Sequence, residues 1–360
     1  MKNTKELRTW LDDMKLNHPL VIAGPCSAET EEQVLKIAHE LKDSDVNYYR
    51  AGIWKPRTRP GNFEGVGALG LGWLKKVKQE TGMKTCTEVA NAAHCKLALE
   101  NDVDLLWIGA RSTVSPFIMQ EIADALQGTD KIVLVKNPVN PDLALWLGGI
   151  ERLYTAGIKN LGAIHRGFST YEKTKYRNIP EWQLAIEFQN KFPDLPLICD
   201  PSHITGNRDM IFDVSQTALD LNFDGVMIET HTDPDNAWSD AAQQVTPAAL
   251  IQIMKDLKIR KESDDTDKYQ ASLDNLRAQI NVIDNQLIDS LGKRMKVANQ
   301  IGKLKKGKNV AVLQSKRWNE ILGNMILEGE KVGLSEEFVL KMFKAIHQES
   351  INHQEKIING

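Results

Sequence analysis

The stretch LVIAGPCSAETEEQVLKIAHEL, residues 20–41, sets the pattern for the first two thirds of the chain. A short apolar run is followed by a polar turn and then by a segment with helical periodicity. The same succession recurs eight times between residues 20 and 231. The predicted strands are LVIAG (20–24), VNYYRAGI (46–53), KTCTEV (84–89), DLLWIGA (104–110), KIVLVKN (131–137), NLGAIHR (160–166), PLICD (196–200) and DGVMIET (224–230).

A helical segment follows each predicted strand. These segments lie at about 30–43, 66–80, 91–101, 115–127, 141–156, 180–192, 207–221 and 241–257. Eight strand–helix units in about 240 residues are typical of a (β/α)8 TIM barrel. A doubly wound open sheet is the alternative, because strand order is not visible in a single sequence.

The alternating pattern stops near residue 258, where KIRKESDDTDK (258–268) is almost without apolar residues. From Leu273 onward, apolar residues fall at 273, 276, 280, 283 and 287, as on one face of a helix reaching about 305. Two further helices are predicted at about 314–329 and 335–358. We therefore expect an α/β barrel domain at 1–258, a charged linker at 259–268, and a small all-α three-helix domain at 269–360.

Composition narrows the class of protein. The 360 residues are 42% hydrophobic and 26% charged, as in an ordinary globular protein, and the net charge of −3 argues against binding to nucleic acid or to a membrane surface. Four scattered cysteines without a CxxC pair suit a reducing compartment. The N-terminus lacks the apolar run of a signal peptide, and no stretch approaches the ~20 apolar residues that span a bilayer. We expect a cytoplasmic enzyme.

Charged or polar side chains follow nearly every predicted strand. In a (β/α)8 barrel these positions meet at one mouth, where the catalytic residues of the fold lie. Any one of them could be a solvated loop residue, but together they favour a functional site. They are Cys26, Arg50, Lys55, Arg57, Glu88, Arg111, Lys136, His165, Arg166, His203, Glu229, His231 and Asp240.

Two kinds of chemistry are separable in this set. Sulfur, nitrogen and carboxylate oxygen form a mixed ligand set for a divalent ion such as Mn, Fe, Co or Zn, although a buried cysteine is often only a small apolar residue. Clustered cations need anions, and Arg forks match phosphate and carboxylate geometry, which predicts small phosphorylated substrates. The candidate ligands are Cys26, His203, Glu229 and Asp240, and the cations are Arg50, Lys55, Arg57, Arg111, Lys136 and Arg166.

The motifs GPCS (24–27), KPRT (55–58), GAR (109–111), HRG (165–167) and DPSH (200–203) resemble those of 3-deoxy-D-arabino-heptulosonate 7-phosphate (DAHP) synthases of the shorter Iβ type, over about residues 16–257. That family condenses phosphoenolpyruvate with erythrose 4-phosphate, with loss of phosphate, toward chorismate and the aromatic amino acids. It uses a divalent metal. The resemblance implies that Mn²⁺, or alternatively Fe, Co or Zn, is held by Cys26, His203, Glu229 and Asp240.

The resemblance also implies roles for the remaining mouth residues. Arg50 and the catalytic Lys55 would hold the phosphoenolpyruvate carboxylate, and Arg57 and Thr58 the phosphate of erythrose 4-phosphate. Arg111, Lys136 and Arg166 would hold the phosphoenolpyruvate phosphate, with Glu88 and His165 among the substrate-binding residues. The sister enzyme that makes 3-deoxy-octulosonate 8-phosphate shares the barrel and is the alternative, although KPRT favours the four-carbon aldose.

The helical tail places cations on an apolar face. Counting in sevens from Leu273 reaches Arg294, and Lys305 lies about three turns further along the same face. Arg277 projects from a different face and would serve such a site from another chain or by helix crossing. Inward-pointing cations in a helical bundle need anions, unless they reach solvent at a helix end.

The segment 269–358 resembles the all-helical chorismate mutases, in which three helices intertwine into a dimer and each site takes an arginine from the partner. The resemblance implies that Arg277, Arg294 and Arg317 bind the carboxylates of chorismate, Lys305 and Gln354 its ether oxygen, and Ser350 a carboxylate. Gln314 and Trp318 replace a frequent aspartate and glutamate near the substrate hydroxyl. The rearrangement to prephenate needs only orientation and charge stabilisation.

The sequence therefore predicts a bifunctional enzyme of aromatic biosynthesis that forms a homodimer or a higher homo-oligomer through its tail. Prephenate or chorismate bound to the tail would inhibit the barrel. The alternative for the tail is a non-catalytic module for dimerisation and for sensing these compounds.

Overall fold

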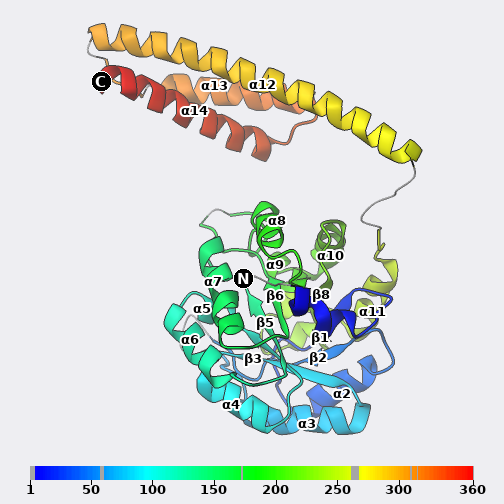
Figure 1. Ribbon diagram of the computed structural model, residues 1–360. Helices are drawn as coiled ribbons and strands as arrows, with labels where there is room; N and C mark the ends of the chain where they lie inside the picture. The colour runs from blue at the N-terminus through cyan, green and yellow to red at the C-terminus, as the bar shows by residue number, and fades with distance from the viewer. Residues whose placement is uncertain are drawn as a thin grey trace. The chain divides into compact units, whose positions relative to one another are not determined.

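A computed structural model describes residues 5–56, 61–171, 173–260, 267–308, 310–313 and 315–359, without the side chains of residues 267, 268, 315 and 316. The chain divides into two compact units, residues 1–262 and 263–360. The first is a closed parallel barrel and the second is all helical, so the predicted fold class is confirmed (Figure 1). No helix of the described residues is long and apolar enough to cross a membrane.

Eight parallel strands within the described residues close into a barrel in which β8 pairs with β1. The open-sheet alternative is therefore wrong. The second strand is shorter than predicted because the residues after Arg50 pack against the loop after β1, where the Ala28 N–H donates to the Gly52 carbonyl (3.0 Å). The strands are β1 (Leu20–Gly24), β2 (Tyr48–Arg50), β3 (Lys84–Val89), β4 (Leu105–Ile108), β5 (Ile132–Lys136), β6 (Leu161–His165), β7 (Leu197–Cys199) and β8 (Gly225–Glu229).

A longer helix follows each strand. Side-chain caps fix several helix starts: the Thr30, Asn91 and Asp142 side chains each accept a hydrogen bond from a backbone N–H in the first turn. The longer helices are α2 (Glu31–Leu41), α3 (Leu69–Thr81), α4 (Ala92–Glu100), α6 (Pro116–Ala125), α7 (Leu143–Thr155), α8 (Trp182–Lys191), α10 (Ile211–Asp220) and α11 (Pro247–Asp256). Shorter ones are η1 (Lys5–Arg8), α1 (Thr9–Asp12), α5 (Ala110–Thr113), α9 (Pro201–Thr205), η2 (Arg208–Met210), η3 (Pro234–Asn236) and η4 (Ala241–Gln243).

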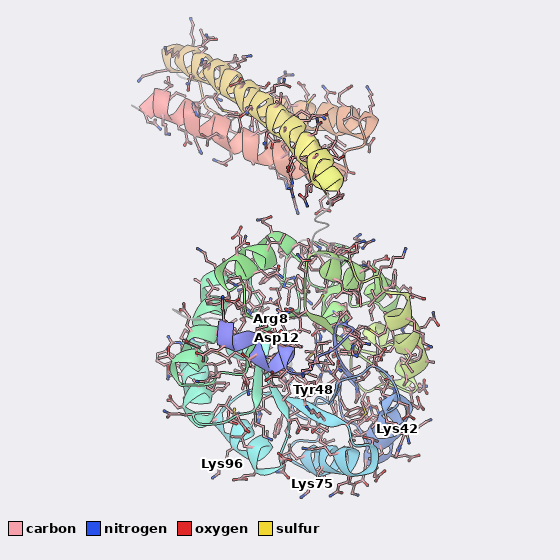
Figure 2. All side chains as sticks on the ribbon, turned by 45° about the vertical axis from the view of Figure 1, so that its right-hand side comes forward. Arg8, Asp12, Lys42, Tyr48, Lys75 and Lys96 are labelled. Carbon is pink, nitrogen blue, oxygen red and sulfur yellow. The ribbon has the colours of Figure 1, made fainter. Side chains whose placement is uncertain are left out.

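The N-terminal segment closes one end of the barrel. Trp10 and Leu11 pack against the apolar side chains of the barrel interior, and the Trp10 indole donates to the Leu161 carbonyl at the start of β6 (2.8 Å). Arg8 pairs with Asp224, which precedes β8. Figure 2 shows the N-terminal helical segment, with Arg8 in η1 and Asp12 in α1, lying across the barrel. These contacts are made where the strands begin. The N-terminal segment around Trp10, which we call the plug, therefore lies at the end of the barrel opposite the mouth.

The second unit consists of α12 (Asp267–Lys308), α13 (Ser315–Lys331) and α14 (Glu336–Asn359). Helix α14 packs along α12 and along α13, after a turn in which Gly333 adopts a positive φ of 80°. The predicted apolar face of α12 is largely uncovered. Its side chains at Leu276, Ile280, Ile283 and Leu287 are between 54% and 57% exposed.

Candidate active sites

The four candidate metal ligands lie at the carboxyl ends of β1, β7 and β8 as two pairs. Cys26 Sγ is 3.3 Å from Asp240 Oδ2, and His203 Nε2 is 3.8 Å from Glu229 Oε1. Cys26 and Glu229 are fully buried, and the other two are largely so. Among the described residues, no group of three or more His, Cys, Asp or Glu side chains is arranged to hold a metal ion.

The donor set nevertheless fits a divalent cation. In three of the four residues one side-chain atom is anchored by a neighbour, and the other atom faces another member of the set. Metal ligands are commonly oriented in this way by a second layer of hydrogen bonds. The anchoring contacts are Asp200 to His203 Nδ1 (2.8 Å), Gln243 Nε2 to Glu229 Oε2 (2.6 Å) and Arg177 to Asp240 Oδ1 (2.8 Å).

A lysine contacts both the side chain and the backbone of Cys26. Lys55 Nζ lies 3.0 Å from Cys26 Sγ and 2.9 Å from the Cys26 carbonyl oxygen. Burial raises the pKa of the Cys26 thiol to about 12, so the protonated thiol donates to Asp240. Burial opposes the charge on Lys55, but Cys26 and Glu229 outweigh it and hold the pKa of this lysine above its usual value.

Asp240 has a backbone conformation that is uncommon for a residue other than glycine. Its φ is +50°, in the left-handed region. Burial opposes ionisation of the Asp240 carboxyl, but Arg177 and Lys55 outweigh burial and lower its pKa. Strain of this kind concentrates at functional sites, where surrounding contacts impose it.

Arg50 contacts one candidate ligand and keeps two of its own donors open. It is 1% exposed, its guanidinium lies 3.1 Å from Glu229 Oε1, and its central carbon is 5.0 Å from the Trp107 ring. Its Nε and Nη1 atoms are buried and have no hydrogen-bond partner among the described residues. Unpaired buried donors are costly, so this arrangement is suited to an incoming anion.

Other predicted cations lie at the carboxyl ends of neighbouring strands, Lys136 at the end of β5 and Arg166 just after β6. Lys136 Nζ lies 2.8 Å from Asp200, and Arg166 Nη1 donates to Asn178 Oδ1 (2.7 Å). Burial lowers the pKa of Arg166 to about 10, and the charges of Arg111 and Glu88 both act on it. Glu88 accepts from the Trp107 indole (2.9 Å). Arg57 and Thr58 lie outside the described residues.

In the helical unit, α12 and α14 bring three predicted residues together: Arg294, Ser350 and Gln354. Arg294 donates to the Ser350 hydroxyl, and Gln354 Nε2 donates to the Ser350 carbonyl (3.2 Å). Gln354 Oε1 is buried without a partner among the described residues. Lys305 donates to the Val312 carbonyl (2.5 Å), and burial lowers the pKa values of both Arg294 and Lys305.

The remaining predicted tail residues lie apart from this group. Arg277 is 64% exposed and pairs with Asp274, and Arg317 is 67% exposed and pairs with Glu320. Gln314 lies outside the described residues. Trp318 stacks on His347, with 4.0 Å between the ring centroids.

Comparison with known proteins identifies both units. The DAHP synthetase I family matches residues 15–266. The chain belongs to this family. Chorismate mutase type II matches residues 276–355. The protein therefore joins a DAHP synthase domain to a chorismate mutase domain, as a bifunctional enzyme of aromatic biosynthesis.

Individual relatives agree with the family match. A phospho-2-dehydro-3-deoxyheptonate aldolase of Thermotoga maritima is 30% identical over 250 residues, covering 69% of this chain and 72% of its own. A crystal structure of a DAHP synthase from the same organism covers 67% of this chain and 68% of its own, with a TM-score of 0.59 and 28% identity. A 2-dehydro-3-deoxyphosphooctonate aldolase of Rhodopseudomonas palustris is 28% identical, covering 65% of this chain and 85% of its own.

One predicted substrate-binding residue of the DAHP synthase domain is misplaced. His165 is fully buried between the barrel and its helices, with ring centroids 5.5 to 6.2 Å from those of Trp146, Phe168, Trp182 and Phe223. Side chains alternate along a strand, and the preceding residue packs in the barrel interior, so His165 points outward. The prediction that it binds substrate is wrong.

The synthase mouth also contains residues that sequence reasoning missed. Asp200 and Gln243 orient candidate ligands, and Arg177 and Asn178 lie in the loop between β6 and α8. Asp200 stands in the DPSH motif, three residues before His203, and this spacing was the available signal. The other three, Gln243, Arg177 and Asn178, do not directly follow a strand, so their positions in the sequence gave no signal. His231, predicted at the mouth, follows β8 and lies 3.4 Å from the buried Glu29, which follows β1.

Proposed function

We propose that the barrel condenses phosphoenolpyruvate with erythrose 4-phosphate, releasing phosphate and forming DAHP, and that the helical unit rearranges chorismate to prephenate. One observation carries the first assignment. The buried Arg50 touches the candidate ligand Glu229 on one side and keeps two donors open on the other. An anion held by those donors would lie beside the proposed metal ligands.

Phosphoenolpyruvate would be held at both of its charged ends. The open donors of Arg50 and the ammonium of Lys55 would bind its carboxylate, and Arg111, Lys136 and Arg166 its phosphate. Glu88, itself held by an indole, limits the excess positive charge around Arg166. Fixed cations of this kind offset the repulsion between two anionic substrates as they approach. We assign the phosphate of erythrose 4-phosphate to Arg57 and Thr58.

The family is generally metal-dependent, and we propose Mn²⁺ first, with Fe, Co or Zn as alternatives. Cys26, His203, Glu229 and Asp240 would hold the ion. When bound, such an ion supplies Lewis-acid polarisation of the aldehyde. The chain's own part is to keep one atom of each ligand turned inward and to keep cations close by.

The decisive experiment follows phosphoenolpyruvate loss with erythrose 4-phosphate, before and after chelation and with each metal restored. The expected result is activity that disappears on chelation and returns best with Mn²⁺. The sister reaction would need a five-carbon aldose phosphate, because its product has eight carbons. Faster turnover with that sugar, or full activity after chelation, would overturn the assignment.

We propose that the mutase works as a homodimer. The apolar residues on α12 are more than half exposed in one chain, and burying them against a second copy is favourable. Arg277 lies on the same half of α12, so one copy would contribute it to the other's site. Arg294, Arg317 and Ser350 would bind the carboxylates of chorismate, and Lys305 and Gln354 its ether oxygen, with Gln314 near the substrate hydroxyl.

The alternative for the helical unit is a dimerisation and sensing module without turnover. A direct assay of chorismate consumption by Arg294→Ala separates the two, with the exposed neighbour Lys293→Ala as control. A catalytic domain loses most of its activity only in Arg294→Ala, whereas a sensing module consumes no chorismate in any form. We further propose that prephenate or chorismate bound here inhibits the barrel.

We also assign the enzyme to the cytoplasm. All four cysteines are free and buried, which supports a reducing compartment. Fractionation of cells followed by detection of the chain tests this assignment, and recovery mainly outside the soluble cell contents would contradict it.

A further inference from the structure

We propose that Arg177 and Asn178 form a strut that positions Arg166 and the proposed metal ligands together, so that binding of the substrate phosphate and of the divalent cation depend on each other. This inference rests on the proposed function of the barrel. Both residues belong to the loop between β6 and α8, and they are positioning residues rather than catalytic ones. We call them the 177–178 strut.

Asn178 connects the residue that follows β6 to α9, the short helix after β7. Its side chain is 5% exposed, and both ends of its amide are used. Oδ1 accepts from Arg166 Nη1 (2.7 Å), and Nδ2 donates to the His203 carbonyl (2.6 Å). A guanidinium only donates and a carbonyl only accepts, so an amide in this orientation satisfies both partners and a carboxylate does not.

Arg177 connects the same loop to the segment after β8. Its Nη1 donates to Asp240 Oδ1 (2.8 Å) and to Gln243 Oε1 (2.6 Å). Gln243 in turn donates to Glu229 Oε2 (2.6 Å). One guanidinium therefore orients two candidate ligands, the first directly and the second through an amide.

The backbone of the strut is itself fixed. Phe168 and Ile179 exchange two backbone hydrogen bonds of 2.8 Å, and the Asn178 N–H donates to the Ile204 carbonyl (3.1 Å). Gly167 has a φ of +74°, and a Cβ there would lie 2.7 Å from the Asn178 carbonyl oxygen. The close approach of these two backbone segments leaves the strut little room to move alone.

A shared rigid element couples the two binding events. Phosphate bound by Arg166 fixes the guanidinium against Asn178, and Asn178 holds the carbonyl of His203. Coupling between sites is reciprocal, so a cation that orders His203 and Asp240 must favour phosphate binding by the same factor. Typical coupling corresponds to a change in affinity of roughly 5- to 150-fold.

The test measures Mn²⁺ affinity of the full-length protein with and without saturating phosphoenolpyruvate, in the absence of erythrose 4-phosphate so that no turnover occurs. Free Mn²⁺ is followed by electron paramagnetic resonance, and Mn²⁺ binding by phosphoenolpyruvate alone is subtracted. In the wild type, phosphoenolpyruvate is expected to tighten Mn²⁺ binding at least ~5-fold. Asn178→Asp keeps the shape of the side chain but cannot donate to the His203 carbonyl. In this variant the ratio of the Mn²⁺ affinities measured with and without phosphoenolpyruvate should fall toward one.

Ser169→Ala is the matched control, because Ser169 lies in the same loop and bonds to the exposed Asn140 (3.1 Å). It should keep the wild-type ratio. Arg177→Met serves as a second variant should Asn178→Asp not fold, since Met removes the one nitrogen that contacts both Asp240 and Gln243. A wild-type ratio of one, or an unchanged ratio in a folded strut variant, overturns the inference. Failure of the wild type to consume phosphoenolpyruvate with erythrose 4-phosphate would instead overturn the proposed function.

Discussion

Asp200 holds the imidazole of His203 by its Nδ1 atom at 2.8 Å. The same fully buried carboxylate lies 2.8 Å from Lys136 Nζ and accepts the backbone N–H of His203 at the start of α9. Burial opposes ionisation of Asp200, but His203 and Lys136 outweigh it and hold its pKa well below the usual range. One anion therefore orients a proposed metal ligand and a proposed phosphate-binding cation at once.

Asp200→Asn is expected to weaken Mn²⁺ binding by about 10- to 100-fold, because the residue that fixes the tautomer and orientation of His203 loses its charge. Titration of the metal-free protein with Mn²⁺ measures the effect. Asp220→Asn, which alters a surface ion pair with Arg260, is the matched control and should bind Mn²⁺ as the wild type does. Equal affinity in the two variants would contradict this role.

His165 should make stability depend on pH. Burial lowers its pKa to about 4, from an ordinary value of 6.5 that the unfolded chain keeps. Between these values the unfolded state takes up a proton that the folded state refuses, so stability is full above pH 6.5 and declines as pH falls toward 4. The expected decline from this residue is about 3 kcal/mol.

In His165→Phe the loss of stability that is due to the histidine should be missing. Urea unfolding at a series of pH values gives the free energy of unfolding of variant and wild type. The contributions of the other titrating groups cancel in the difference between the two. His39→Gln, at an exposed ion pair with Glu80, is the control. A difference between His165→Phe and wild type that does not change between pH 7 and 4 would rule the mechanism out.

Trp10→Ala should destabilise the barrel by roughly 3–5 kcal/mol, because it empties the plug and removes the hydrogen bond to β6. The free energy of unfolding in urea, followed by circular dichroism, measures the loss. Trp238→Ala, at a side chain that is 54% exposed, should cost far less. Comparable losses would mean that the plug contributes little.

Ile283→Glu should separate the subunits, because it places a charge on the apolar face of α12. A dissociation constant raised on the order of 100-fold or more is expected. Sedimentation velocity measures the state, and mutase activity should fall with it, since each site would lack an arginine from the other copy. Asn285→Glu adds the same charge two residues further on, away from this face, and should leave the assembly intact. A wild-type protein that sediments as a monomer would contradict the proposed dimer.

Feedback between the activities predicts that removing residues 265–360 abolishes inhibition of phosphoenolpyruvate loss by prephenate or chorismate. Arg294→Ala should weaken that inhibition by at least ~10-fold, because a charged hydrogen bond to a carboxylate contributes about 1.5–3 kcal/mol. Inhibition curves, each scaled to the uninhibited rate of the same protein, provide the measurement. Undiminished inhibition of the shortened chain would place the inhibitor site in the barrel.

The strands and helices were predictable because parallel strands covered on both sides leave continuous apolar runs. Cys26, His203, Glu229 and Asp240 could be assembled from positions far apart in sequence because barrel topology gathers strand ends. What periodicity does not encode is the path of long loops. Arg177 therefore gave no signal, although it touches one candidate ligand directly and orients a second through Gln243.

His165 shows a different limit. It is the last residue but one of a predicted strand, next to Arg166, and position along a strand does not by itself tell which way a side chain points. Counting in twos from Ile164, which faces the barrel interior, would have sent His165 outward. Which residue of a strand faces inward depends on register in the closed barrel, and a run of apolar residues on both faces conceals it.

The plug at the base of the barrel has a consequence for biosynthesis. The partner of Trp10 is the carbonyl of Leu161, 151 residues later in the chain. A ribosome making about 5–20 residues per second therefore leaves Trp10 without this partner for roughly 8 to 30 seconds. During this time the exposed apolar indole is a suitable binding site for a chaperone. The plug is then one of the last parts of the barrel to pack.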